Sequence, residues 1–222
     1  MDEPVTPDAV TPDPVTPDPE RSLGLAHFDR LWASENDPWG LESSWYEDRK
    51  RALSVAALPE PRYRRALEPG CAGGALSELL APRCAELHCL DVADPALERA
   101  RTRLAPYRHV RVGRGGIPDD LPAGPFDLVV VSEVAYYLGT PDRAALWRTV
   151  VDALEPGGTV LAVHWIREAP EYPVTGDQVH DELAGIDGLA PLADHREADF
   201  RLDVLVRTPP PARSVALRAG VR

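Results

Sequence analysis

The chain has 222 residues, 44% of them hydrophobic, which is enough to bury the core of one domain of ordinary size. Its net charge of −12 argues against free nucleic acid or an anionic membrane as the main partner. No apolar run approaches the roughly 18 residues that span a bilayer, and the acidic, proline-rich start is unlike a signal peptide. We therefore expect a cytoplasmic protein with no nucleic-acid and no membrane partner.

Residues 5–19 repeat a pentamer that begins Val-Thr-Pro-Asp. A proline in every repeat forbids a helix, and the segment has too little apolar surface to fold. Six acidic residues and no Lys or Arg lie within residues 1–20, so this part carries half of the net charge. We predict a disordered acidic tail over residues 1–22, solvated rather than serving as a docking arm.

Residues 23–60 are predicted to form a helical lid before the main domain. Helices are expected over 23–31 and 44–58, separated by a turn that contains Trp39. Ser44 and Glu47 have the spacing of a capping box at the start of the second helix. Its apolar face is expected at Leu53, Ala56 and Ala57. Trp39 is either a packing residue or a ligand contact.

A glycine turn follows the first apolar strand. The strand at 63–67 ends in Glu68, glycines follow at 70, 73 and 74, and a helix is expected over 75–80. Glycines allow a ligand to approach the backbone, and a helix start directs N–H donors toward it. The spacing differs from the G-x-G-x-x-G turn of dinucleotide sites. The acid before Gly70 would repel a pyrophosphate but suits a cationic nucleoside such as S-adenosylmethionine.

Strands and helices then alternate. Further strands are expected at 87–91, 109–112, 126–131 and 159–164, with helices over 95–104 and 141–154. This alternation predicts a Rossmann-like α/β fold with a doubly wound, mostly parallel sheet. Two more strands, near 189–195 and 200–206, lack a helix between them and should form an antiparallel edge hairpin, giving seven strands. Residues 208–222 read as a flexible basic tail.

Asp91 ends the second strand, 23 residues after Glu68. In nucleotide-binding α/β folds, an acid about 20 residues after the end of the first strand commonly binds the ribose hydroxyls. The alternative is a cap for the next helix, a role for which Asp94 is better placed. We favour the ribose role for Asp91.

Together these motifs resemble the class I S-adenosylmethionine-dependent methyltransferases over about residues 25–207. Within that class the chain looks most like the nodulation-type (NodS-like) N-methyltransferases, whose known members methylate an amine on an amino sugar. The motifs behind the resemblance are Leu67-Glu68-x-Gly70-x-x-x-Gly74, Asp91, Phe126-Asp127-Leu128-Val129, Leu154-x-Pro156-Gly157-Gly158, Asp37-Pro38-Trp39, Trp45-Tyr46-Glu47-Asp48-Arg49-Lys50, Gly70-Cys71-Ala72 and Ser132-Glu133-Val134-x-Tyr136-Tyr137-Leu138.

The resemblance implies S-adenosylmethionine as the cofactor and assigns its contacts. The methionine end would be held by Glu68, Gly70, Cys71 and Gly74, and the ribose by Asp91 and Val92. Gly116 and Ile117 would contact the adenine, and Glu133 and Val134 would lie beside the sulfonium. Trp39 and Arg49 of the lid would close over the cofactor, with Arg49 pairing its carboxylate.

Two positions depart from the pattern. Ala72 stands where the wider superfamily has a glycine. Gly116 stands where many relatives carry an Asp that accepts the adenine amino group. The two alternatives are that the nearby Asp119 substitutes for it or that backbone and packing alone hold the adenine.

Methyl transfer needs a neutral, aligned nucleophile, and a carboxylate or His near the ends of strands four and five can position it. The candidate catalytic residues are Glu133, Tyr136, Tyr137, His164 and His180. A tyrosine in the core and a structural hydrogen bond of His164 are the competing interpretations.

The predicted function is N-methylation of a small-molecule amine, such as an amino sugar or a natural-product intermediate, by a monomer or homodimer. O-methylation and a non-catalytic S-adenosylmethionine-binding protein are the alternatives. The odd set of Cys71, Cys84 and Cys89 lacks C-x-x-C pairs, so we expect reduced thiols and no metal site.

Overall fold

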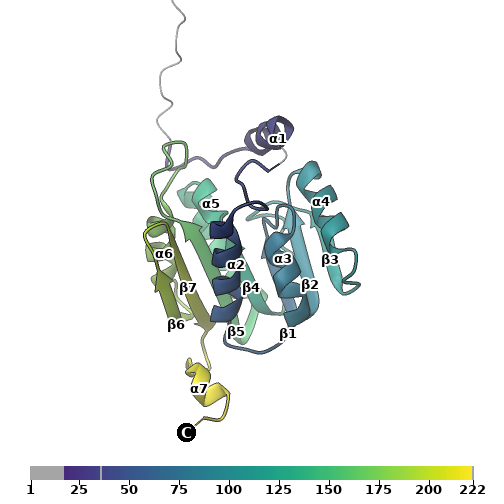
Figure 1. Cartoon of the computed structure of the whole chain (residues 1–222). Helices are drawn as coiled ribbons and strands as arrows, with labels where there is room; N and C mark the ends of the chain where they lie inside the picture. The colour runs from purple at the N-terminus through teal and green to yellow at the C-terminus, as the bar shows by residue number, and fades with distance from the viewer. Residues whose placement is uncertain (1–17, 36, 222) are drawn as a thin grey trace, which may run out of the picture.

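The computed structural model describes residues 18–35 and 37–221, and a seven-stranded sheet forms its centre (Figure 1). The strand order is β3-β2-β1-β4-β5-β7-β6, with β1 to β5 parallel and β7 antiparallel to β5 and β6. The strands are β1 (Tyr63–Pro69), β2 (Cys84–Asp91), β3 (Val110–Arg114), β4 (Phe126–Ser132), β5 (Leu154–Trp165), β6 (Leu189–Arg196) and β7 (Phe200–Arg207). The predicted Rossmann-like fold with an antiparallel edge pair is confirmed.

Helices cover both faces of the sheet because its central strands are apolar on both sides. On β4, Leu128 and Val130 belong to one core cluster, whereas Val129 and Val131 belong to the other. The first cluster packs against α2, α3 and α4, and the second against α5 and α6. The helices are α1 (Leu25–Ser34), α2 (Trp45–Ala57), α3 (Ala75–Leu80), α4 (Asp94–Leu104), α5 (Thr140–Ala153), α6 (Gly176–Ala184) and α7 (Val215–Arg218), with 3-10 turns η1 (Ala81–Arg83) and η2 (Ala135–Tyr137).

The lid helices lie where predicted, and α2 packs polar as well as apolar side chains. Leu53 and Ala57 of the predicted apolar face are partly buried against the core, whereas Ala56 is exposed. The fully buried residues of α2 are the polar Glu47, Lys50, Arg51 and Ser54. Ser44 makes no side-chain cap bond, so the predicted capping box is also wrong. The carboxylate of Glu47 instead accepts a hydrogen bond from Nζ of Lys50 at 2.7 Å.

Two terminal segments pack against the domain. Most of the predicted disordered tail lies outside the described residues, but residues 18–22 are described and bound to it. The carbonyl of Pro19 accepts from Thr140 N at 2.9 Å, and the Ser22 hydroxyl donates to Asp142. Close to the C-terminus, where we expected no helix or strand, α7 lies beyond one end of the strands, and α1 lies at the opposite end (Figure 1).

Within the described residues, no helix is both long and apolar enough to cross a membrane.

Candidate active site

A cavity of about 670 Å³ lies at the carboxyl ends of β1, β2 and β4, beneath the lid. Ligands of doubly wound folds bind at this edge of the sheet, where the strand order reverses between β1 and β4. Most of the predicted site residues line the cavity, namely Trp39, Glu68, Gly70, Cys71, Asp91, Val92, Gly116, Ile117, Glu133, Val134, Tyr136 and Tyr137. The structure therefore brings together residues that are up to 98 positions apart, as Trp39 and Tyr137 are.

The glycine turn between β1 and α3 forms one wall. Gly70 has φ +73°, and a Cβ there would lie 2.2 Å from Cγ1 of Val134. Only glycine therefore allows the end of β1 to approach the end of β4 so closely. Ala72 also has a positive φ, 46°, at the position where relatives carry glycine. Gly74 begins α3, and its missing Cβ faces α4 rather than the cavity.

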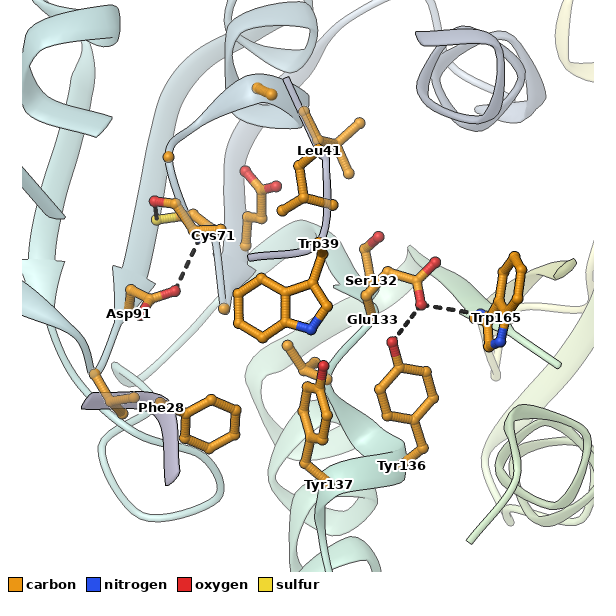
Figure 2. Close-up of a pocket in the computed structure, with 18 of the residues that line it drawn as sticks. Phe28, Trp39, Leu41, Cys71, Asp91, Ser132, Glu133, Tyr136, Tyr137 and Trp165 are labelled. Carbon is orange, nitrogen blue, oxygen red and sulfur yellow. Dashed lines mark hydrogen bonds between the residues drawn. The ribbon is translucent and has the colours of Figure 1, made fainter. Parts of the chain in front are cut away.

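Asp91 holds the glycine turn from the neighbouring strand. Its Oδ2 accepts a hydrogen bond from the backbone N of Ala72 at 2.9 Å, and its Oδ1 accepts from Ala93 at 3.0 Å (Figure 2). Burial raises the pKa of Asp91, and these N–H donors oppose the rise. The carboxylate is thus oriented at the end of β2, beside the cavity, by bonds that leave lone pairs for a ligand.

Glu68 is almost completely buried at the end of β1 and lines the cavity. Its Oε2 accepts a hydrogen bond from the hydroxyl of Ser77 at 2.5 Å. Burial raises the pKa of Glu68 to about 7, with a further rise from the charge of Asp91. A buried acid with so few donors is suited to a cationic ligand group, which would stabilise its ionised form.

Glu133 is the centre of a hydrogen-bond network on the opposite wall. It follows β4 with φ 57°, a strained conformation for a residue with a Cβ. Its Oε1 accepts from Nζ of Lys50 at 2.5 Å, and its Oε2 accepts from the hydroxyl of Tyr136 at 2.5 Å and from Trp165 N at 2.9 Å (Figure 2). Burial and the charge of Glu133 raise the pKa of Tyr136 well above its usual range. The phenol therefore stays protonated as a donor.

The buried face of α2 supplies the charges of the lid. Lys50 lies between Glu133 and Glu47, and although burial acts to lower its pKa, these two carboxylates raise it. Arg51 donates to Leu41 O at 2.5 Å and to Asp48 at 2.6 Å. Both cations line the cavity.

The predicted position of Arg49 is wrong. Its guanidinium pairs with Glu197 at 2.7 Å, and the residue does not line the cavity. Successive residues of a helix are about 100° apart, so Arg49 projects from the side of α2 toward the β6–β7 hairpin while Lys50 faces inward.

Aromatic side chains form the remainder of the wall near Glu133. The rings of Tyr136 and Tyr172 stack with centroids 4.8 Å apart, and Tyr137 meets Tyr172 edge-on at 4.8 Å. Phe28 of α1 meets Tyr137 edge-on at 5.1 Å, and Trp39 lies between this group and the glycine turn (Figure 2). Such a wall, with a carboxylate beside it, suits a cation or the apolar face of a ring.

His164 and His180 do not line the cavity, which corrects their predicted place in it. Both are completely buried and hydrogen-bonded to each other between β5 and α6. His164 shares the side of β5 that carries Val160 and Ala162, whose side chains pack in the core beneath α5 and α6.

At the other end of the cavity, Val92, Gly116 and Ile117 line the region predicted for adenine. Asp119 and Asp120 both line a hollow with Val92, Gly116 and Ile117. Oδ2 of Asp120 accepts a hydrogen bond from Gly116 N at 2.9 Å.

Sequence reasoning placed none of Glu47, Lys50, Arg51, Ser54 and Tyr172 in the site, although all five line the cavity. The four α2 residues recur at i, i+3, i+4 and i+7, which is the spacing of one helix face. This spacing could have indicated that they face the same side of α2.

Among the described residues, no group of three or more His, Cys, Asp or Glu side chains is arranged to hold a metal ion. The three cysteines are buried free thiols.

The fold and cavity place the chain in the class I S-adenosylmethionine-dependent methyltransferases. The family model for Nodulation protein S (NodS) matches residues 29–165, which is more than half of the chain. The chain belongs to the NodS family.

Individual relatives agree with this assignment. Nodulation protein S of Bradyrhizobium diazoefficiens is 36% identical over 128 residues, which are 57% of this chain and 61% of that protein. The matches cover 54–61% of the length of the first three curated relatives. Ubiquinone biosynthesis O-methyltransferase of Idiomarina loihiensis is 32% identical over 104 residues, 44% of this chain and 41% of that protein.

Two solved structures are similar over most of the chain. N-methyltransferase NodS from Bradyrhizobium japonicum WM9, in complex with S-adenosyl-L-homocysteine, superposes with a TM-score of 0.73 at 28% identity, covering 84% of this chain and 98% of that one. A Pseudomonas syringae protein described as a methyltransferase superposes with a TM-score of 0.66 at 46% identity, covering 74% and 100%.

Proposed function

We propose that the protein transfers a methyl group from S-adenosylmethionine to the nitrogen of a small-molecule amine, such as an amino sugar or a natural-product intermediate. The observation that carries the proposal is the pairing of two halves in one cavity. One half is the glycine turn with Glu68 and Asp91, and the other is the Glu133 network with its aromatic wall. Family membership and the N-methyltransferase structure support the same function.

The residues present fit the cofactor. The approach of Gly70 to Val134 leaves a cradle that a Cβ would fill. Asp91 at the end of β2 suits the ribose hydroxyls, and the buried Glu68 suits the ammonium group of the methionine end. Arg51 or Lys50, rather than the outward-facing Arg49, suits its carboxylate. The bound cofactor supplies an electrophilic methyl group on a sulfonium.

The residues of this chain would act mainly by alignment. Positioning of two reactants can supply ~7–11 kcal/mol in well-oriented systems. Lys50, Tyr136 and Trp165 N donate to the carboxylate of Glu133 and fix its orientation in the cavity. Glu133 is therefore suited to accept an N–H bond from the amine and orient its lone pair. The aromatic wall would exclude water and stabilise positive charge, by roughly 0.5–2 kcal/mol per ring.

The proposal includes a soluble amine as the partner, without nucleic acid or membrane, and a cytoplasmic protein acting as a monomer or homodimer. The acidic composition supports the first part, because a chain with a net charge of −12 repels polyanions.

The test is a methyl-transfer assay with matched acceptors. Amino sugars and their N-acetyl derivatives are incubated with the protein and labelled S-adenosylmethionine, and the products are identified by mass spectrometry. We expect label in the free amines and none in the N-acetyl forms. Equal labelling of both would support O-methylation, for which the O-methyltransferase relative is the specific observation. Labelling of neither, with S-adenosylhomocysteine still bound, would support a non-catalytic binding protein.

A further inference from the structure

A chain of hydrogen bonds joins three buried side chains to the backbone beneath the cavity. Oδ2 of Asp203 lies 2.8 Å from Nδ1 of His180, and Nε2 of His180 lies 3.1 Å from Nδ1 of His164. The backbone N of Ala135 lies 3.3 Å from Nε2 of His164. The two imidazoles are completely buried, so no solvent competes with these bonds.

The bond from Ala135 sets the direction of the whole chain. A backbone N–H can only donate, so Nε2 of His164 accepts and the proton of a neutral ring lies on Nδ1. Nδ1 of His164 then donates to Nε2 of His180, which places the second proton on Nδ1 of His180, facing the Asp203 carboxylate. Burial holds the pKa of His164 well below its usual range, with help from His180 and Lys50. His164 is therefore neutral, and the hydrogen-bond direction places one tautomer at each ring.

The hydrogen-bond chain ends at the segment that carries Glu133 and Tyr136, which we call the acceptor wall because the amine is proposed to bind beside them. Ala135 opens η2, whose next residue is Tyr136. The end of β5 holds this segment by two further bonds, because Glu133 N donates to Val163 O at 2.8 Å and Trp165 N donates to the Glu133 carboxylate at 2.9 Å. The side chain of His164 thus adds the third attachment between the end of β5 and the end of β4.

The other end of the hydrogen-bond chain, at Asp203, lies on β7 of the antiparallel edge strands. Asp203 also accepts from Nε of Arg201 at 3.2 Å, and Arg201 pairs with Asp181 of α6 at 2.7 Å. α6 is pressed against β5, since a Cβ on Gly176 would lie 2.1 Å from Trp165 O. One turn later, this contact brings His180 to His164.

The chain does not lead into the cavity. Its last member is an amide N–H, which does not accept a proton, and neither histidine lines the cavity. This connectivity excludes delivery of a proton to the acceptor along the relay and leaves a role in geometry.

We propose that His164, His180 and Asp203 form a positioning relay that fixes Glu133 and Tyr136 in the acceptor wall. The relay connects β7 and α6 to the wall of the cavity without contacting a ligand. Its effect on catalysis rests on the proposed function, whereas its hydrogen bonds and tautomers do not.

Two variants of His180 distinguish the effect of its hydrogen bonds from the effect of its side-chain volume. His180→Gln retains an acceptor for His164 and a donor for Asp203, whereas His180→Leu fills the space without either. Small displacements at a reacting centre can cost up to about 100-fold, so we expect His180→Leu to lower kcat/KM for the amine at least tenfold. The affinity for S-adenosylhomocysteine should stay unchanged, and His180→Gln should recover most of the activity. Equal activity of wild type and His180→Leu, or equal loss in both variants, would overturn the proposal.

A second measurement needs neither activity nor a variant. Long-range ¹H–¹⁵N NMR of histidine rings in the wild-type protein reports their tautomers. The relay predicts neutral Nδ1–H forms for His164 and His180 at neutral pH. An Nε2–H or doubly protonated His164 would overturn it. If no amine is methylated, the proposed function fails and this spectrum still decides the relay.

Discussion

The ammonium nitrogen of Lys50 lies 2.5 Å from Oε1 of Glu133 and joins the lid to the end of β4. The same nitrogen lies 2.7 Å from Oε1 of Glu47, so one cation bridges two carboxylates. The side chain of Lys50 is only 5% exposed, which means that little water competes for it. This pairing sets the charge and orientation of the acceptor wall.

Replacement of Lys50 by Met should leave Glu133 without its cation and Glu47 with only the more distant Arg51, whose guanidinium lies 3.8 Å from it. Loss of one partner of a buried pair typically costs about 3–5 kcal/mol, and we expect a decrease toward the lower end in the free energy of unfolding, measured by urea denaturation. Methylation of the amine should fall at least tenfold, as the orientation of Glu133 is lost.

Arg49→Met is the matched control for this variant. It removes the same charge from the adjacent position, but the Arg49–Glu197 pair is on the surface, where solvent screening leaves such pairs little effect on stability. Similar losses in both variants would contradict the role of the buried pair.

The raised pKa of Glu68 predicts a pH dependence of stability. The folded carboxyl, with a pKa of about 7, holds its proton more tightly than the unfolded one, whose ordinary value is 4.5. Its contribution to stability is therefore present at acidic pH and is lost as the pH rises from 4.5 through 7. Glu68→Gln should flatten this part of the stability–pH curve and make the ligand-free protein more stable above pH 7.

The same variant should weaken cofactor binding. Its amide carries no charge to pair with the ammonium group of S-adenosylhomocysteine, and we expect an affinity loss of about tenfold or more by calorimetry. An unchanged affinity would show that Glu68 does not face this group.

Arg51 is predicted to act on the carboxylate of the cofactor. Arg51→Met should weaken binding of S-adenosylhomocysteine by about tenfold, but it should not affect 5′-methylthioadenosine, which lacks the amino-acid end. Fluorescence titration with both ligands measures the difference. Equal weakening for the two ligands would indicate a general disturbance of the lid instead.

Gly70→Ala tests the close approach at the glycine turn. The new Cβ would meet Val134 at 2.2 Å, and the positive φ adds strain. We expect a loss of both stability and S-adenosylhomocysteine binding. The control is Gly113→Ala on β3, whose Cβ would make an ordinary 3.5 Å contact. Wild-type binding by Gly70→Ala would refute the importance of this cradle.

The sequence predicted the part of the site that follows strand ends. Glu68 and Asp91 each follow an apolar run, and parallel strands bring their carboxyl ends to one edge, so these residues could be placed before the structure was known. Gly70 could be placed for the same reason. The antiparallel pairing of the edge strands also followed from the missing helix between them.

The lid and the end of β5 could not be predicted in the same way. We predicted only an apolar buried face for α2, but the face that closes the cavity carries Lys50 and Arg51. His164 was predicted at the cavity because it ends a central strand, whereas strand alternation points it toward α6. The path of residues 166–188, which brings Tyr172 and His180 into place, depends on tertiary packing that no local pattern encodes.

The central claim is that this cavity binds S-adenosylmethionine through Asp91 and the glycine turn, and calorimetric titration with S-adenosylhomocysteine tests it most directly. We predict saturable one-to-one binding by the wild-type protein. Asp91→Asn keeps one of the two acceptor oxygens that bind Ala72 N and Ala93 N and loses the charge. It should bind about tenfold or more weakly, since hydrogen bonds to a charged group contribute ~1.5–3 kcal/mol. No detectable binding by the wild-type protein would contradict the account.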